Sequence, residues 1–159
     1  MAQIESFQLD HTIVHAPYVR IAGVDHHPSG AAVQKYDLRL IQPNEGAIPT
    51  AGLHTLEHFL STFLRDEVEG IIDLSPMGCR TGFYLVLWDE HPPEEIAAGL
   101  ERSLKKVLEQ TTVPAATEKQ CGNAADHSLA VAQEYARQVL DQGISLDPFK
   151  RNVLGEQAE

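Results

Sequence analysis

The chain has 159 residues, 43% of them hydrophobic, and its 12 basic and 23 acidic side chains give a formal net charge of −11. This length suits one compact core, so we expect a single domain over residues 1–159. The negative charge repels phosphate backbones and anionic lipids. Residues 1–6 do not resemble a secretion signal, and the longest apolar run, residues 83–88, is too short to cross a bilayer. We therefore expect a cytoplasmic protein with no nucleic-acid or membrane partner.

The first forty residues predict an arm and two strands. Residues 5–20 show no clear hydrophobic period and contain a proline, so we expect an arm followed by a short strand. Residues 23–30 are rich in turn-forming side chains. Residues 32–42 alternate apolar and polar side chains, which predicts a half-buried strand with Lys35 and Arg39 on one face.

The middle of the chain predicts a long helix and a buried strand. Residues 48–68 place leucine and phenylalanine at the helical period. Residues 71–82 predict a loop that carries Cys79, and the apolar run 83–88 predicts a central strand.

Two further helices are expected in the last third. One begins at the prolines and glutamates of residues 92–95 and is broken by residues 111–114. The other covers residues 126–140, which places Cys121 near a helix start, where the helix dipole favours a thiolate. Residues 151–159 are expected to be frayed. From the residues alone we predict a mixed α/β fold.

The stretch His54-Thr55-Leu56-Glu57-His58 carries the strongest chemical signal. Two histidines four residues apart lie on one helix face and can meet one ion, and the glutamate between them can transfer protons. A catalytic site of this kind takes a third protein ligand, which either Cys79 or Cys121 could supply. In a reducing compartment these cysteines are better ligands or reagents than disulfide partners.

Two other functions share parts of this pattern. An inverted-zincin-like metallopeptidase has the same histidine and glutamate spacing, but it needs a carboxylate as third ligand and a larger substrate chamber. A non-catalytic metal-binding module explains the histidines and one cysteine, but it leaves Glu57 and Cys79 without a role.

Over nearly its whole length the chain resembles the S-ribosylhomocysteine lyases, the bacterial autoinducer-2 synthases. The motifs that carry the resemblance are Glu5-Ser6-Phe7, Leu9-Asp10-His11-Thr12, Ala16-Pro17-Tyr18-Val19-Arg20, Asp37-Leu38-Arg39, Gln42-Pro43-Asn44, His54-Thr55-Leu56-Glu57-His58, Ser75-Pro76-Met77-Gly78-Cys79-Arg80-Thr81-Gly82-Phe83-Tyr84 and Glu118-Lys119-Gln120-Cys121-Gly122-Asn123. Together these motifs are highly specific.

The resemblance implies an α/β (α+β) domain with a mostly antiparallel sheet packed against helices, forming a homodimer with active sites at the interface. It implies cleavage of S-ribosylhomocysteine to homocysteine and 4,5-dihydroxy-2,3-pentanedione, the autoinducer-2 precursor. The metal would be one divalent ion per chain, Fe²⁺ natively and replaceable by Zn²⁺ or Co²⁺. The residues it assigns are, for the metal, His54, His58 and Cys121; for acid/base catalysis, Cys79 and Glu57; and for substrate binding, Ser6, His11, Lys35, Arg39 and Asp73.

Overall fold

A four-stranded antiparallel sheet forms the centre of the computed structural model, which describes residues 1–156. The strands lie in the order β1-β2-β4-β3, and all neighbours are antiparallel. In chain order the elements are α1 (Glu5–Gln8), β1 (Tyr18–His26), β2 (Ala32–Arg39), α2 (Thr50–Glu67), β3 (Ile71–Pro76), β4 (Gly82–Trp88), α3 (Pro93–Leu108) and α4 (Leu129–Gln142). The expected α+β class with an antiparallel sheet and packed helices is confirmed.

The central strand β4 shows how the sheet acquires two different faces. Phe83, Leu85 and Leu87 are fully buried, whereas Tyr84 and Val86 between them are half-buried. Successive side chains of a strand point to opposite sides, so this alternation gives the sheet one apolar face and one partly open face.

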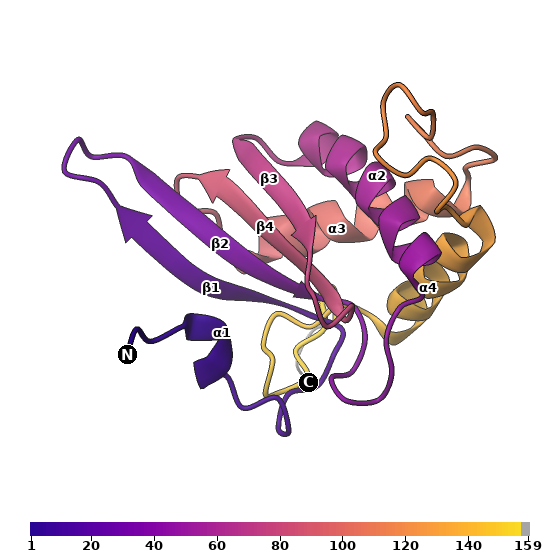
Figure 1. The fold of residues 1–159 in the computed structure, drawn as a ribbon. Helices are drawn as coiled ribbons and strands as arrows, with labels where there is room; N and C mark the ends of the chain where they lie inside the picture. Colours follow the sequence, from indigo (N-terminus) through magenta and orange to yellow (C-terminus); the bar gives the residue numbers. More distant parts are fainter. Residues whose placement is uncertain (157–159) are drawn as a thin grey trace.

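Helices α2, α3 and α4 pack together on the apolar side of the sheet (Figure 1). Leu56 and Leu60 of α2 and Ile96 and Leu104 of α3 are fully buried in one core that also contains the β4 side chains. Burying such a side chain contributes about 1.5–3 kcal/mol, so this shared core is what holds α2 in place. Within residues 1–156, no helix has the length and apolar character needed to cross a bilayer.

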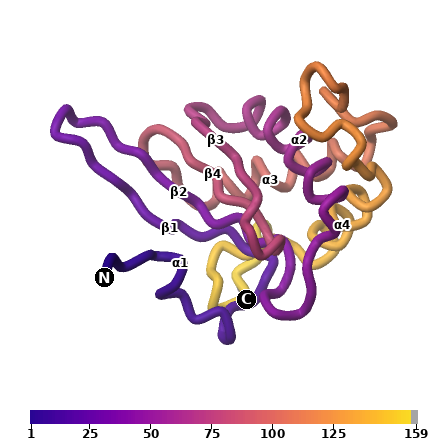
Figure 2. Tube along the Cα trace, viewed as in Figure 1, coloured from indigo at the N-terminus to yellow at the C-terminus, as the bar shows by residue number. Residues whose placement is uncertain are grey.

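The segment 109–128, between α3 and α4, contains no regular helix or strand and runs beside α2 (orange in Figure 2). Two hydrogen bonds attach it there: His54 to the carbonyl oxygen of Asp126, and His58 to the carbonyl oxygen of Pro114. An irregular segment is therefore positioned by side chains of a rigid helix.

A buried ion pair lies on the open face of the sheet. Arg39 and Asp37 of β2 are both almost completely buried, and the Arg39 guanidinium is 2.9 Å from the Asp37 carboxylate. Arg20 of β1 donates to the same carboxylate. Burial lowers the pKa of Arg39, but the hydrogen bonds and charge of Asp37 outweigh it and raise that pKa above its ordinary value. Arg39 is a fixed positive charge.

The N-terminal half differs from expectation in three places, one of which is the short helix α1 (Glu5–Gln8) within the expected arm. The segment expected as a loop, residues 71–82, contains the edge strand β3 (Ile71–Pro76). A register shift between Ile71 and Asp73 interrupts its alternation, which is why the sequence pattern does not indicate a strand. Strand β1 also extends to His26, into the region expected as a turn.

The C-terminal third also needs two corrections. Helix α4 begins at Leu129, later than the expected 126, because the Ser128 hydroxyl caps it by accepting the Val131 N–H. Residues 151–154 are held in place, since Val153 forms a bridge with Ser145 and the Leu154 N–H donates to Ile144. Residues 157–159 of the tail expected to be frayed lie outside the described residues.

Candidate functional site

Helix α2 presents His54 and His58 on one face, with ring centroids 4.7 Å apart. Nδ1 of His54 is 2.8 Å from the carbonyl oxygen of Asp126, and Nδ1 of His58 is 2.8 Å from that of Pro114. A carbonyl oxygen can only accept, so each Nδ1 carries the proton and donates it. Each Nε2 is left with a lone pair, which is the arrangement of a metal-ligating histidine.

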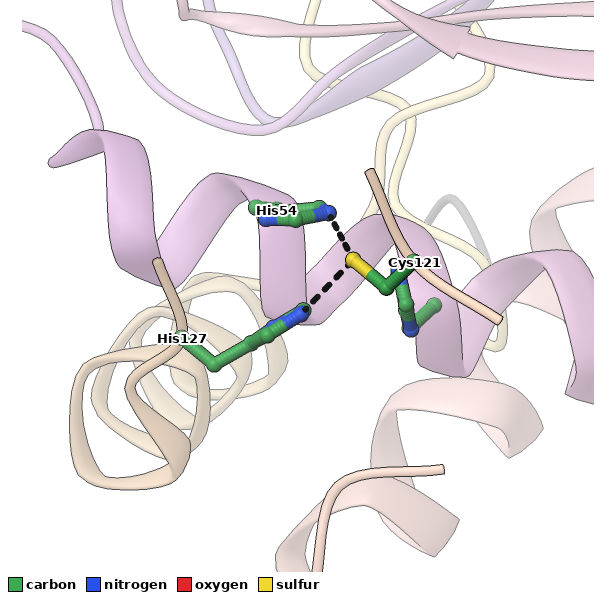
Figure 3. Close-up of side chains that lie close together, drawn as sticks. His54, Cys121 and His127 are labelled. Carbon is green, nitrogen blue, oxygen red and sulfur yellow. Dashed lines mark hydrogen bonds between the residues drawn. The ribbon is translucent and has the colours of Figure 1, made fainter. Parts of the chain in front are cut away.

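Cys121, in the segment 109–128, completes a three-donor set. Its sulfur is 3.4 Å from Nε2 of His54 (Figure 3). A tetrahedral ion about 2.3 Å from sulfur and about 2.0 Å from nitrogen separates those two atoms by about 3.5 Å. Two imidazole nitrogens and a sulfur at this spacing suit a divalent transition metal. Of the two cysteines, Cys121 is therefore the one beside the histidines, as the resemblance implies.

His127 is a fourth member of this cluster that the sequence analysis did not identify. Its ring stacks on His54 at 4.0 Å, and its Nε2 is 3.6 Å from the Cys121 sulfur (Figure 3). The potential ligand atoms of all four residues lie within 4.8 Å of one another. Burial, and then the nearby His54 and His58, lower the pKa of His127. Its spacing from the other members follows no local pattern that would have indicated it.

Cys121 does not lie near a helix start, contrary to the sequence prediction. Helix α4 begins at Leu129, eight residues (129 − 121) beyond Cys121, and a helix dipole acts only within about the first turn. If Cys121 binds a metal ion, the ion and not a helix end would hold its sulfur as a thiolate ligand.

A separate cavity of about 280 Å³ gathers four of the other predicted residues: Ser6, His11, Arg39 and Cys79. Phe7, Met77, Gly78 and Tyr84 complete its lining. The N-terminal arm, strand β2 and the β3–β4 turn thus meet around the exposed thiol of Cys79.

Three predicted residues lie outside this lining. The Lys35 ammonium sits over the Tyr84 ring, 4.4 Å from its centroid. Asp73 is exposed on β3, where its carboxylate accepts the Ser75 hydroxyl. Glu57 is half-buried on α2 and lies between His54 and His58 in the sequence.

A chain of hydrogen bonds joins Cys79 to a positive charge through Thr81. Nη1 of Arg39 is 3.1 Å from the Thr81 hydroxyl oxygen, which is 3.0 Å from the Cys79 sulfur. A guanidinium can only donate, so the Thr81 oxygen accepts from Arg39 and its proton is free for the sulfur. Arg80, which follows Cys79 in the sequence, donates instead to the carbonyl oxygen of Ile48.

Comparisons with known proteins identify the family of this chain. The model of the family described as "S-Ribosylhomocysteinase (LuxS)" matches residues 4–150. The chain is 60% identical over 151 residues to the S-ribosylhomocysteine lyase of Enterococcus faecalis, covering 95% of this chain and 99% of that protein. It is 55% identical over 157 residues to the S-ribosylhomocysteine lyase of Lactobacillus acidophilus, covering 97% and 100%. The chain therefore belongs to the S-ribosylhomocysteinase (LuxS) family.

Proposed function

We propose that this protein cleaves S-ribosylhomocysteine to homocysteine and 4,5-dihydroxy-2,3-pentanedione. One combination of observations carries the proposal. The chain has a donor set of His54, His58 and Cys121 and a cavity that contains a thiol, and it is 60% identical to an S-ribosylhomocysteine lyase.

The proposed substrate sets the chemical requirements. Its thioether carbon is not activated, so the sugar carbonyl has to migrate from C1 to C2 and then to C3 before the C4 proton becomes acidic. Loss of that proton then expels the homocysteine thiolate by β-elimination. Each step moves protons between neighbouring atoms and needs no redox cofactor.

His54, His58 and Cys121 would hold the divalent ion, Fe²⁺ in the native enzyme and Zn²⁺ or Co²⁺ as replacements. When bound, the ion supplies a Lewis acid for the sugar oxygens. Because three protein donors leave a tetrahedral position open, the site would suit a substrate oxygen.

Cys79 is proposed as the residue that takes protons from the sugar carbons and returns them. Thr81 would stabilise its thiolate, because a thiolate can only accept, and the Thr81 hydroxyl, whose oxygen accepts from Arg39, would then donate to the sulfur. Glu57 would transfer protons to and from oxygen and assist the elimination. The substrate would be bound within the cavity by Ser6, His11 and Arg39. Lys35 and Asp73 are proposed for the same role, although they lie outside the cavity lining.

We further propose a homodimer with two active sites at its interface. No residue of the Cys79 cavity belongs to the metal-binding cluster, so each chain contributes two separate parts. Phe7, which lines the cavity, is 78% exposed, and Trp88 on the open face of the sheet is 50% exposed. A second copy would cover these apolar side chains and bring its cluster to the cavity.

The two other functions fit less well. Among residues 1–156 the metal-binding cluster consists of imidazoles and a thiol, without the carboxylate ligand of a metallopeptidase. A non-catalytic module would not need an exposed thiol linked to a buried guanidinium.

The test is anaerobic incubation of the Fe²⁺-loaded protein with S-ribosylhomocysteine, followed by assay of released homocysteine. Cys79→Ala should keep its metal and release none, whereas Cys121→Ala and His58→Ala should lose both metal and activity. Homocysteine release by Cys79→Ala at the wild-type rate would contradict the role of Cys79. Stoichiometric metal in His58→Ala would contradict the metal centre.

A further inference from the structure

His127 raises a question that distances alone do not answer. Its Nε2 is 3.6 Å from the Cys121 sulfur, which fits a fourth ligand of a shared ion and equally fits a hydrogen bond from N–H to sulfur. The first arrangement closes the metal site with four protein donors. The second leaves one position open.

The proton on the other nitrogen of His127 decides between the two arrangements. Nδ1 is 2.9 Å from the hydroxyl oxygen of Thr55. If Nδ1 donates to Thr55, Nε2 has the lone pair that a metal needs. If the Thr55 hydroxyl donates to Nδ1, the neutral ring carries its proton on Nε2.

The surroundings of Thr55 favour the second arrangement. Thr55 is completely buried on α2, and its oxygen already accepts the Ser128 N–H at 3.0 Å. A buried hydroxyl proton needs an acceptor, and an unsatisfied one costs about 1–3 kcal/mol. Within the described part of the chain, Nδ1 of His127 is the acceptor recorded for it. His54 and His58 differ, because their Nδ1 atoms face carbonyl oxygens that can only accept.

We propose that His127 is not a metal ligand but donates a hydrogen bond from Nε2 to the Cys121 sulfur, in a tautomer fixed by the Thr55 hydroxyl. His127 is then a positioning residue of the metal centre. Its hydrogen bond draws charge from the thiolate, which strengthens the ion as a Lewis acid, and it keeps the fourth coordination position open. The inference deepens the proposed function, since it concerns the same metal centre.

The test is a long-range ¹H–¹⁵N correlation spectrum of histidine-labelled protein, recorded metal-free and with Zn²⁺. His127 should carry its proton on Nε2 in both forms, and His54 and His58 should carry theirs on Nδ1 with Nε2 resonances that shift on zinc addition. A zinc-loaded His127 protonated on Nδ1, or on both nitrogens, would overturn the inference. If zinc shifts neither His54 nor His58, the proposed metal centre fails, while the tautomer in the same spectra still decides the hydrogen bond.

A matched pair of variants gives a second readout in Co²⁺-loaded protein. Thr55→Val removes the hydroxyl, so His127 should lose its preference for the Nε2 proton and the sulfur should lose its donor. The sulfur-to-cobalt charge-transfer band should then move to longer wavelength, whereas Thr55→Ser should keep the wild-type band. The same band position in all three proteins would overturn the inference. If Thr55→Val does not fold, the wild-type NMR spectra remain decisive.

Discussion

Thr81 shows how much chemistry one hydroxyl group can determine. It is almost completely buried and connects a guanidinium that only donates to a thiol that reacts as a thiolate. The Thr81 oxygen accepts from Arg39, and the Thr81 hydroxyl donates to the sulfur when Cys79 is a thiolate, which can only accept. Thr81 lies in one of the motifs of the family resemblance, but its contact with Cys79 depends on the turn between β3 and β4, which the residue pattern does not show.

Replacing Thr81 by valine, which has the same shape, should slow both homocysteine release and alkylation of Cys79 at neutral pH. A hydrogen bond to a charged group contributes about 1.5–3 kcal/mol, so the expected loss is about ten- to a hundredfold. Iodoacetamide labelling followed by peptide mass spectrometry measures the reactivity of Cys79 separately from Cys121. Thr81→Ser is the matched control and should stay near the wild-type rate.

The two effects of the Thr81→Val substitution can be separated by pH. Loss of the hydrogen bond should slow alkylation at neutral pH only, because at high pH both proteins carry the thiolate. An equally slow rate at high pH would show that the substitution blocks access to the thiol, against the proposed role.

The residues around the proposed metal centre illustrate what residue patterns predict and what they miss. His54, Glu57 and His58 lie on one helix, so the helical period predicts their shared face. Cys121 needed the family resemblance, because it reaches the site from an irregular segment. His127 comes from the same segment, and its place depends on a hydrogen bond to Thr55, which is 72 residues away in the sequence.

At the scale of elements, strongly periodic segments were predicted well. Helix α2, expected at 48–68, spans Thr50–Glu67, and strand β4, expected at 83–88, spans Gly82–Trp88. Strand β3 was missed because its register shift breaks the two-residue period. The start of α4 was misplaced because the sequence does not show that Ser128 acts as its cap.

The packing of α2 against α4 depends on Gly52. A Cβ at this position would overlap the Val131 side chain. Gly52→Ala gains about 1 kcal/mol of helix propensity but overpacks a β-branched side chain with little rotamer freedom, at a cost of about 1–3 kcal/mol or more. We expect the free energy of unfolding, measured in urea, to fall. Zn²⁺ binding should also weaken, because a displaced α4 would displace Ser128 and His127, which directly precede it.

Two further variants check the Gly52 prediction. Gly23→Ala should be tolerated far better, since nothing lies within 4 Å of its added Cβ. Adding Val131→Ala to Gly52→Ala should recover part of the lost stability. A Gly52→Ala protein as stable as wild type would show that the two helices separate easily.

A charge cluster joins α2 to α3 and gives stability a pH dependence. Hydrogen bonds from Lys106 and then Arg102 lower the pKa of Glu67 below its ordinary value of 4.5. A lowered carboxyl pKa stabilises the folded state above the unfolded pKa, and this contribution is lost as pH falls through the folded pKa. Glu67→Gln should therefore cost about 0.5–1 kcal/mol at pH 7, and its difference from wild type should shrink as pH falls below 4.5.

Urea unfolding of both proteins at several pH values measures the Glu67 effect. Asp66→Asn is a control on the same helix, since Asp66 is exposed. A Glu67→Gln difference that does not change with pH would mean that packing of the side chain, and not its charge, is responsible.

At the scale of the whole molecule, the proposed dimer makes a prediction about which chain supplies which part. A heterodimer of Cys79→Ala with His58→Ala would contain one site with an intact cluster from one chain and an intact thiol from the other. It should show about half of the wild-type activity if the two-fold interface joins the parts. Tagging the two chains differently allows the heterodimer to be purified and its homocysteine release measured.

The reciprocal heterodimer is the control. When one chain carries both substitutions and its partner is wild type, every site joined across the interface lacks one part and should be inactive. If each chain instead built a whole site, the two results would be exchanged. A protein that is monomeric by light scattering would contradict the dimer itself.

The segment 109–128 has a consequence for how long a metal ion stays bound. It supplies the Cys121 sulfur and the two carbonyl oxygens that orient His54 and His58, yet it has no helix or strand of its own. An ion held between this segment and α2 would lose its Cys121 donor when the segment lifts away, so opening of the chain would speed its release. The rate of ion removal should then level off at high chelator concentration, at the rate of opening. Amide exchange within the segment should be faster in metal-free than in zinc-loaded protein.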